Sequence, residues 1–193
     1  MASMERTAQD RIRIAQTAAR YIAEHGIADW SLAKRKAVRE LGLPEREALP
    51  GDNEIEAALL EYHALYGGAV HATRLHDQRT EALRWMQHLR TFAPELVGGV
   101  AAGWATAHSD ICLELVASDA KDVEFALLNA KVAYRTMHGD RDGAAELYID
   151  TAVAGLRLSI RSAFAARQRP PRERHGQEPV RLDTFALTAL LTG

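Results

Sequence analysis

The chain has 193 residues, a hydrophobic fraction of 47% and a formal net charge of −2 at pH 7. This length suits one domain with a helical extension, and the balanced charge excludes a strong overall attraction to nucleic acid or to a membrane surface. A single cysteine excludes an internal disulfide framework. Because the N-terminus lacks the apolar core of a signal peptide and no apolar run approaches the roughly 18 residues that span a bilayer, we expect a cytoplasmic protein without a membrane partner.

Apolar residues recur at helical spacing through the first half of the chain, and glycines and prolines separate the runs. The second run is preceded by Asp29 and Ser31, either of which can cap a helix, and the third is preceded by Asp52 and Asn53. This pattern predicts four helices, over residues 7–25, 29–42, 54–67 and 70–92.

After Pro94 the hydrophobic period changes from helical to alternating. The pattern predicts a short buried strand at 95–100, an alternating strand at 110–117, a capped helix at 119–130 and a further strand at 131–137. Two alternating runs at 145–153 and 155–162 indicate a hairpin. We therefore expect an α+β fold, in which an N-terminal helical region precedes a small mixed β-sheet with flanking helices.

These elements divide the chain into four expected regions. They are a helical extension at 1–69, an α+β core at 70–165, a mobile loop rich in proline and arginine at 166–181, and a C-terminal helix at 182–193 that docks on the core.

The central stretch from Gly98 to Leu115 combines a glycine pair with a carboxylate at the start of a strand. Gly98 and Gly99 allow backbone N–H groups to approach a phosphate without obstruction by Cβ atoms. Ser109 and Asp110 come next to that loop, and Mg²⁺ prefers oxygen ligands such as the Asp110 carboxylate. The stretch therefore predicts a phosphate site at Gly98, Gly99 and Ser109 with a magnesium ligand at Asp110.

The segments 98–103 and 109–113, separated by a five-residue spacer, resemble the signature of the nucleotidyltransferase superfamily related to DNA polymerase beta. The likeness is greatest to its small single-domain bacterial members, whose pattern resembles G-S-R-A-R-G, a short polar spacer, then S-D-I-D-L. The register fits without a gap, and the resemblance covers about residues 80 to 162. It implies a nucleotidyltransferase-like core, Mg²⁺ as cofactor, a nucleoside triphosphate as substrate and a nucleic-acid or protein acceptor.

Three positions depart from that pattern: Gly99 replaces the serine, Val100 replaces an arginine, and Cys112 replaces the second metal-binding aspartate. A neutral thiol is a poor ligand for the hard Mg²⁺ ion. Glu114 is no substitute, since it lies four residues and roughly 13 Å along the strand from Asp110.

Asp150 matches the third carboxylate of the family, so the resemblance implies Asp110 and Asp150 as catalytic residues that share one magnesium ion. The simpler reading is that Asp110 caps a turn and that Asp150 pairs with Arg157 or Arg161 across the hairpin. If active, the chain is a weak nucleotidyltransferase, because Cys112 weakens the metal site.

Two other classes of function stay open, and the sequence does not decide whether the chain is an enzyme. The first is a non-catalytic module that retains the fold and binds a nucleotide or a protein, with homo-oligomerisation through the helical half as one form. The second is a nucleic-acid-binding accessory protein, whose basic clusters are 34–39 and 167–174.

Overall fold

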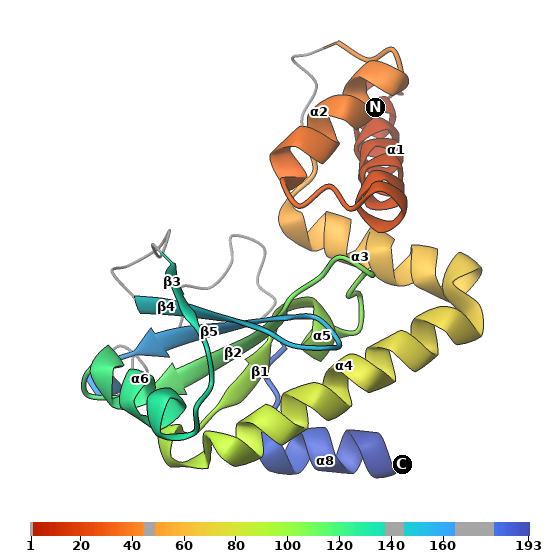
Figure 1. The fold of residues 1–193 in the computed structure, drawn as a ribbon. Helices are drawn as coiled ribbons and strands as arrows, with labels where there is room; N and C mark the ends of the chain where they lie inside the picture. Colours follow the sequence, from red (N-terminus) through yellow and green to blue (C-terminus); the bar gives the residue numbers. More distant parts are fainter. Residues whose placement is uncertain (1, 45–48, 138–144, 165–179) are drawn as a thin grey trace. The chain divides into compact units, whose positions relative to one another are not determined.

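The computed structural model describes residues 2–44, 49–137, 145–164 and 180–193 (Figure 1). The chain divides into a helical unit, residues 1–72 with 106–108, and a sheet unit, residues 73–105 with 109–193. The predicted α+β class is confirmed. In the described part of the chain, no helix is long and apolar enough to cross a membrane.

The helical unit consists of α1 (Ala2–His25), α2 (Trp30–Glu40), α3 (Asp52–Tyr62), a π-helix η1 (His63–Gly67) and the first turn of α4 (Gly68–His88). Asp29 caps α2, because its side chain accepts a hydrogen bond from the Leu32 backbone N–H at 3.1 Å. Both α2 and α3 pack on α1. The core between these helices is made of small and branched residues, including Ile14, Ala18, Ala33, Ile55 and Leu59.

The third predicted helix ends at Gly67 and Gly68, as expected. Its last turn is the π-helix η1, whose wider i→i+5 turn holds one extra residue, and α4 begins at Gly68. Gly68 makes this junction with φ 50° and ψ −150°, which a residue with a Cβ atom rarely adopts. Helix α4 ends at His88, and a 3₁₀ turn η2 (Arg90–Phe92) completes the predicted span before Pro94.

The sheet unit contains a five-stranded mixed sheet in the order β1-β2-β5-β4-β3. Its strands are β1 (Glu95–Val97), β2 (Ile111–Val116), β3 (Arg135–Met137), β4 (Ala145–Asp150) and β5 (Gly155–Arg161). Strands β2 and β5 are parallel, whereas the other three pairs are antiparallel. The hairpin of β4 and β5 forms as predicted, and the Thr151 hydroxyl organises its turn by accepting from the backbone N–H groups of Val153 and Ala154.

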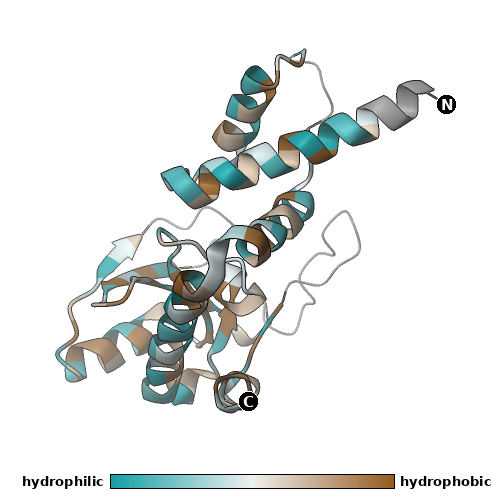
Figure 2. Cartoon of the chain, turned by 90° about the vertical axis from the view of Figure 1, so that its right-hand side faces the viewer, coloured by the Kyte–Doolittle hydropathy of each residue, from teal (hydrophilic) through white to brown (hydrophobic). Residues whose placement is uncertain are grey.

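One face of the sheet is apolar and buried, because alternate strand residues carry aliphatic side chains. This face packs with α4, α6 (Ala120–Asn129) and α8 (Thr184–Thr192), which Figure 1 shows on one side of the sheet. Figure 2, coloured by hydropathy, shows that hydrophobic and hydrophilic residues also alternate along the helices. The buried strand residues are Leu96, Ile111, Leu113, Leu115, Leu147, Ile149, Leu156, Leu158 and Ile160.

Strands of the core are shorter than expected, and the strand predicted at 131–137 begins only at Arg135. The strand predicted at 95–100 stops at Val97, since Gly98 takes φ +71° and opens a short helix α5 (Gly98–Ala102). The C-terminal helix is joined to β1 by an antiparallel bridge between Leu96 and Leu182, and its Leu187 is fully buried. Most of the predicted loop at 166–181 lies outside the described residues.

Candidate functional site

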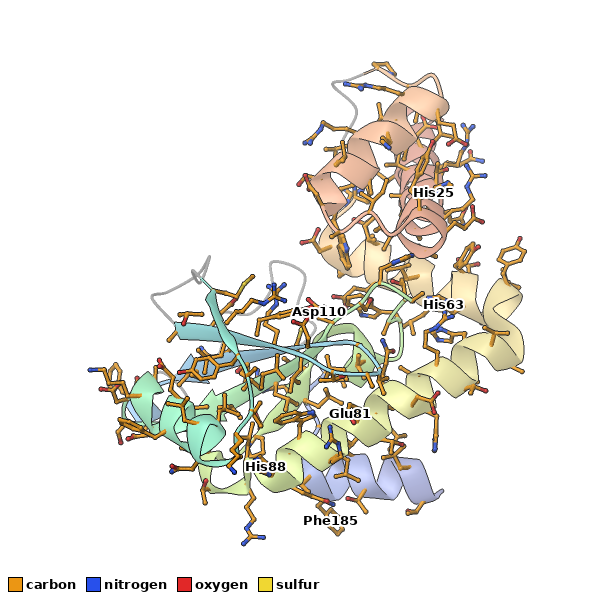
Figure 3. All side chains as sticks on the ribbon, viewed as in Figure 1. His25, His63, Glu81, His88, Asp110 and Phe185 are labelled. Carbon is orange, nitrogen blue, oxygen red and sulfur yellow. The ribbon has the colours of Figure 1, made fainter. Side chains whose placement is uncertain are left out.

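The other face of the sheet, called the polar face here, carries the predicted site. It is formed by side chains of β2, β5 and β4 and by Asp110, which directly precedes β2 and is labelled in Figure 3. Strand register places Cys112 beside Arg157, and Arg157 beside Tyr148. Residues far apart in sequence therefore form one row across three strands.

Arg157 lies at the centre of this row and contacts two carboxylates. Its Nη2 donates to Asp110 Oδ2 at 3.3 Å, and its Nη1 lies 3.8 Å from Glu146 Oε2. The Nε atom is buried without a hydrogen-bond partner among the described residues. The two carboxylate side chains are 29% and 19% exposed, so water screens this cluster only in part.

Gly155, at the start of β5, allows Tyr148 and Asp110 to lie this close together. A Cβ atom at Gly155 would lie 2.0 Å from the Tyr148 hydroxyl and 2.4 Å from Asp110 Oδ1. Gly155, Glu146 and Arg157 were not among the site residues predicted from the sequence. The only local signal was a glycine that opens an alternating strand.

Gly98 of the glycine loop lies beside Cys112, and the position of Gly99 is filled by packing. A Cβ on Gly98 would be 3.9 Å from the Cys112 Cβ, whereas one on Gly99 would be 2.7 Å from the Trp104 ring. The absence of a Cβ at Gly99 therefore leaves room for the Trp104 ring. Ser109 contributes its backbone carbonyl to a hydrogen bond from Gln78 Nε2 at 3.2 Å.

The α5 segment after the loop is held by Arg79 of α4. Its guanidinium donates to the backbone carbonyls of Val100 and Ala101 at 3.0 and 3.2 Å. Burial lowers the pKa of Arg79. Arg79 thus anchors the C-terminal end of a very short helix.

Asp150 lies at the end of β4 and pairs with Arg135 of β3. The Arg135 Nη2 donates to both carboxylate oxygens, at 3.1 and 2.9 Å, and the Asp150 side chain is 76% exposed. Its partner is therefore neither Arg157 nor Arg161. Asp110 and Asp150, expected to share one metal ion, each lie beside a different arginine.

Glu114 belongs to a second cluster at the β1 edge of the polar face. Arg161 donates to Glu114 at 3.1 Å, and Arg181 bridges Glu114 and Glu95. Burial alone would raise the pKa of Glu114, but the hydrogen bonds and charges of Arg181 and Arg161 outweigh burial and hold the pKa below its ordinary value. Glu114 is thus an ion-pair residue, in line with its exclusion as a metal ligand.

Cys112 is a neutral thiol at neutral pH. Burial raises its pKa to about 11, and the positive charge of Arg157 only partly opposes this shift. Among the described residues, no group of three or more His, Cys, Asp or Glu side chains is arranged to hold a metal ion. The magnesium site at Asp110 and Asp150 therefore stays a prediction.

The basic side chains at 34–39 contact different residues. Lys34 is mostly buried and binds Asp52 at 2.7 Å, Arg35 lies 3.9 Å from Asp29, and Lys36 lies over the Tyr21 ring. The second cluster, 167–174, lies outside the described residues. Lys34 and Arg35 of this cluster are thus paired with carboxylates.

Comparison of the chain with protein-family models, with curated proteins and with solved structures gives no match.

Proposed function

We propose that this chain is a non-catalytic interaction protein built on a nucleotidyltransferase-like sheet unit, in which Arg157 takes the place of a metal ion. The observation that carries the proposal is the position of the Arg157 guanidinium, 3.3 Å from Asp110 and 3.8 Å from Glu146. Arginine keeps its charge at any physiological pH, so this cation is permanent.

A divalent cation is disfavoured beside Arg157. Mg²⁺ would have to displace the guanidinium from Asp110 or approach it against like charge. Two-metal phosphoryl chemistry also needs carboxylates that bridge ions about 3.5–4 Å apart. Here Cys112 stands at the second ligand position, and Asp150 is held by Arg135.

A nucleoside triphosphate without metal is disfavoured as well. Asp110 and Glu146 against Arg157 leave one excess negative charge at the centre of the polar face. A triphosphate would be repelled there. The Arg157 charge thus opposes the magnesium ion, and the excess negative charge opposes the triphosphate.

Exposed hydrophobic side chains support the interaction role. Phe125 and Leu128 of α6 are 61% and 56% exposed, and Phe185 of α8, labelled in Figure 3, is 83% exposed. Phe125 and Leu128 are three residues apart and so share one face of α6, and exposed apolar side chains grouped in this way suit a protein partner or a second copy of the chain.

Calorimetric titration with ATP and GTP, in magnesium buffer, tests the proposal. We expect no saturable binding to the wild-type chain at millimolar nucleotide. The double variant Cys112→Asp with Arg157→Ser restores a carboxylate and removes the cation, so we expect it to gain magnesium-dependent binding.

The competing proposal is an active nucleotidyltransferase, which Gly98 beside the start of β2 supports. Magnesium-dependent nucleotide binding by the wild-type chain that is lost in Asp110→Asn would favour the enzyme. It would also contradict the proposal that Arg157 takes the place of a metal ion on the polar face.

A further inference from the structure

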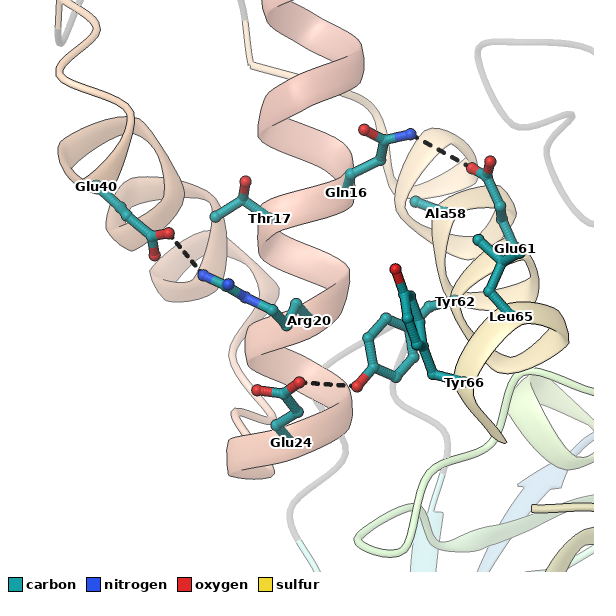
Figure 4. A pocket seen from close by; sticks show the side chains of 10 residues that line it. All are labelled: Gln16, Thr17, Arg20, Glu24, Glu40, Ala58, Glu61, Tyr62, Leu65 and Tyr66. Atoms are coloured by element: carbon teal, nitrogen blue, oxygen red, sulfur yellow. Dashed lines mark hydrogen bonds and ion pairs between the residues drawn. The ribbon is translucent and has the colours of Figure 1, made fainter. Parts of the chain in front are cut away.

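The helical unit contains a cavity of ≈ 390 Å³ between α1, α2, α3 and η1 (Figure 4). This volume falls in the range of pockets that hold small ligands or a partner's side chain. Its charged and aromatic lining residues are Arg20, Glu24, Glu40, Glu61, Tyr62 and Tyr66.

The π-helix η1 forms one rim of this cavity. It carries Leu65 and Tyr66, which are 68% and 72% exposed, and it brings the Tyr66 ring to 5.1 Å from the Tyr62 ring. π-Turns are rare and are frequently found at functional sites. A distorted helix that presents a leucine and an aromatic pair at the mouth of a cavity offers apolar contacts to a ligand.

The charges around the cavity favour a cation. Three glutamates line it and only one arginine, so two negative charges are in excess. Arg20 is bound to Glu40 at 2.6 Å. Glu24 and Glu61 are therefore the carboxylates that a ligand can use.

Both of these carboxylates have hydrogen-bonding capacity left. Glu24 accepts from the Tyr62 hydroxyl through Oε1 at 2.8 Å, and Glu61 accepts from Gln16 at only 3.5 Å. A carboxylate has about four acceptor sites. Burial and the bond to Glu24 raise the pKa of Tyr62, which keeps the tyrosine protonated as the donor of that pair.

We propose that this cavity binds an organic cation, an ammonium or guanidinium group carried on an aliphatic chain. The charged group lies beside Glu24 and near the faces of the two tyrosine rings, the aliphatic chain packs on Leu65, and Glu61 adds negative charge at the other end of the cavity. The inference does not depend on the function proposed for the sheet unit.

The test uses the full-length chain titrated with agmatine, which carries both an ammonium and a guanidinium, and followed by NMR or calorimetry. We expect saturable binding that weakens as ionic strength rises. Glu24→Gln should weaken it about tenfold, since it removes a charge-assisted hydrogen bond. Tyr66→Ala alters a side chain that is 72% exposed, so it should also weaken binding without unfolding the unit.

The matched control is Glu124→Gln. Glu124 accepts from the Tyr134 hydroxyl at 2.9 Å in the sheet unit, which is the same pair type without this cavity. This variant should bind agmatine like the wild type. Equal binding by wild type, Glu24→Gln and Tyr66→Ala, or no saturable binding at all, would overturn the proposal.

Two further probes distinguish the source of the cation. Spermidine represents a free polyamine, and the peptide acetyl-Ala-Leu-Arg-Leu-Ala-amide represents an arginine on a partner protein. Tighter binding of the peptide than of spermidine assigns the cavity to a partner's side chain, and the reverse order assigns it to a polyamine. Either order supports the site if Glu24→Gln weakens the binding.

Discussion

The polar face of the sheet and the cavity of the helical unit use the same residue types with opposite results. Each combines tyrosine, arginine and glutamate or aspartate side chains. On the sheet, Arg157 reaches carboxylates on both sides, because neighbouring strands lie about 4.8 Å apart. In the helical unit, Arg20 forms its ion pair with one of the three glutamates that line the cavity, Glu40, and helix axes about 8–10 Å apart leave space between the side chains.

Strand spacing thus favours internal charge pairing, whereas helix spacing leaves carboxylates for a ligand. A site whose charges are already paired has little to gain from a metal ion or a phosphate. The following variants test this difference, from the largest expected effect to the smallest.

Of the three substitutions, Arg157→Met should have the largest effect on stability. It leaves Asp110 and Glu146 facing each other without a cation, in a partly buried place. We expect the free energy of unfolding to fall by about 2 kcal/mol in urea denaturation. Added Mg²⁺ should recover part of that loss in the variant and leave the wild type unchanged. If Arg157→Met were as stable as the wild type, Arg157 would not be needed between the two carboxylates.

Glu114→Gln should destabilise the chain by about 1 kcal/mol at neutral pH, since it leaves Arg161 and Arg181 without their shared carboxylate. The folded-state pKa of Glu114 is lowered, so its stabilisation is present above the unfolded pKa and is lost as pH falls through the folded pKa. The free energies of unfolding of wild type and variant, measured at pH values from 7 downward, should therefore converge as the pH falls. A constant difference at every pH would contradict the assigned ion pairs.

Cys112 should react slowly with iodoacetamide. A rise in pKa from 9.0 to about 11 reduces the thiolate fraction about 100-fold at pH 8. Mass spectrometry should show much slower alkylation in the folded chain than in urea. Equal rates would mean that the thiol beside Arg157 is not held neutral.

Asp150→Asn should have the smallest effect on stability. The Asp150 side chain is 76% exposed and binds only Arg135 among the described residues, and such surface pairs contribute little. We expect a change in unfolding free energy within about 0.5 kcal/mol. A loss comparable with that of Arg157→Met would assign Asp150 to the central cluster.

Local patterns predicted most elements of this fold. The Asp29 cap lies where the sequence placed it, and β2, β4 and β5 follow the alternating runs, because burial of one sheet face imposes a period of two. The end of the third helix at Gly67 and Gly68 was also predicted, since glycine pairs usually end helices, whereas its final π-turn has no clear sequence pattern.

The partners within the candidate site could not be predicted from local patterns. The contact of Arg157 with Asp110 and Glu146 depends on β5 lying between β2 and β4, and β2 and β5 are paired in parallel across a long connection. Hydrophobic alternation indicates which face a residue shares but not which strand lies beside it. Asp110 was therefore identified, whereas its arginine was not.

The most direct test of the central claim is titration of the isotope-labelled chain with Mn²⁺, followed by paramagnetic broadening of backbone amide signals in NMR. If Arg157 is the cation of the polar face, the signals of residues 110–114 should broaden no more than those of exposed carboxylates elsewhere. Saturable broadening confined to Asp110 and its neighbours, removed by Asp110→Asn, would contradict the account and place a metal ion where we assign the guanidinium.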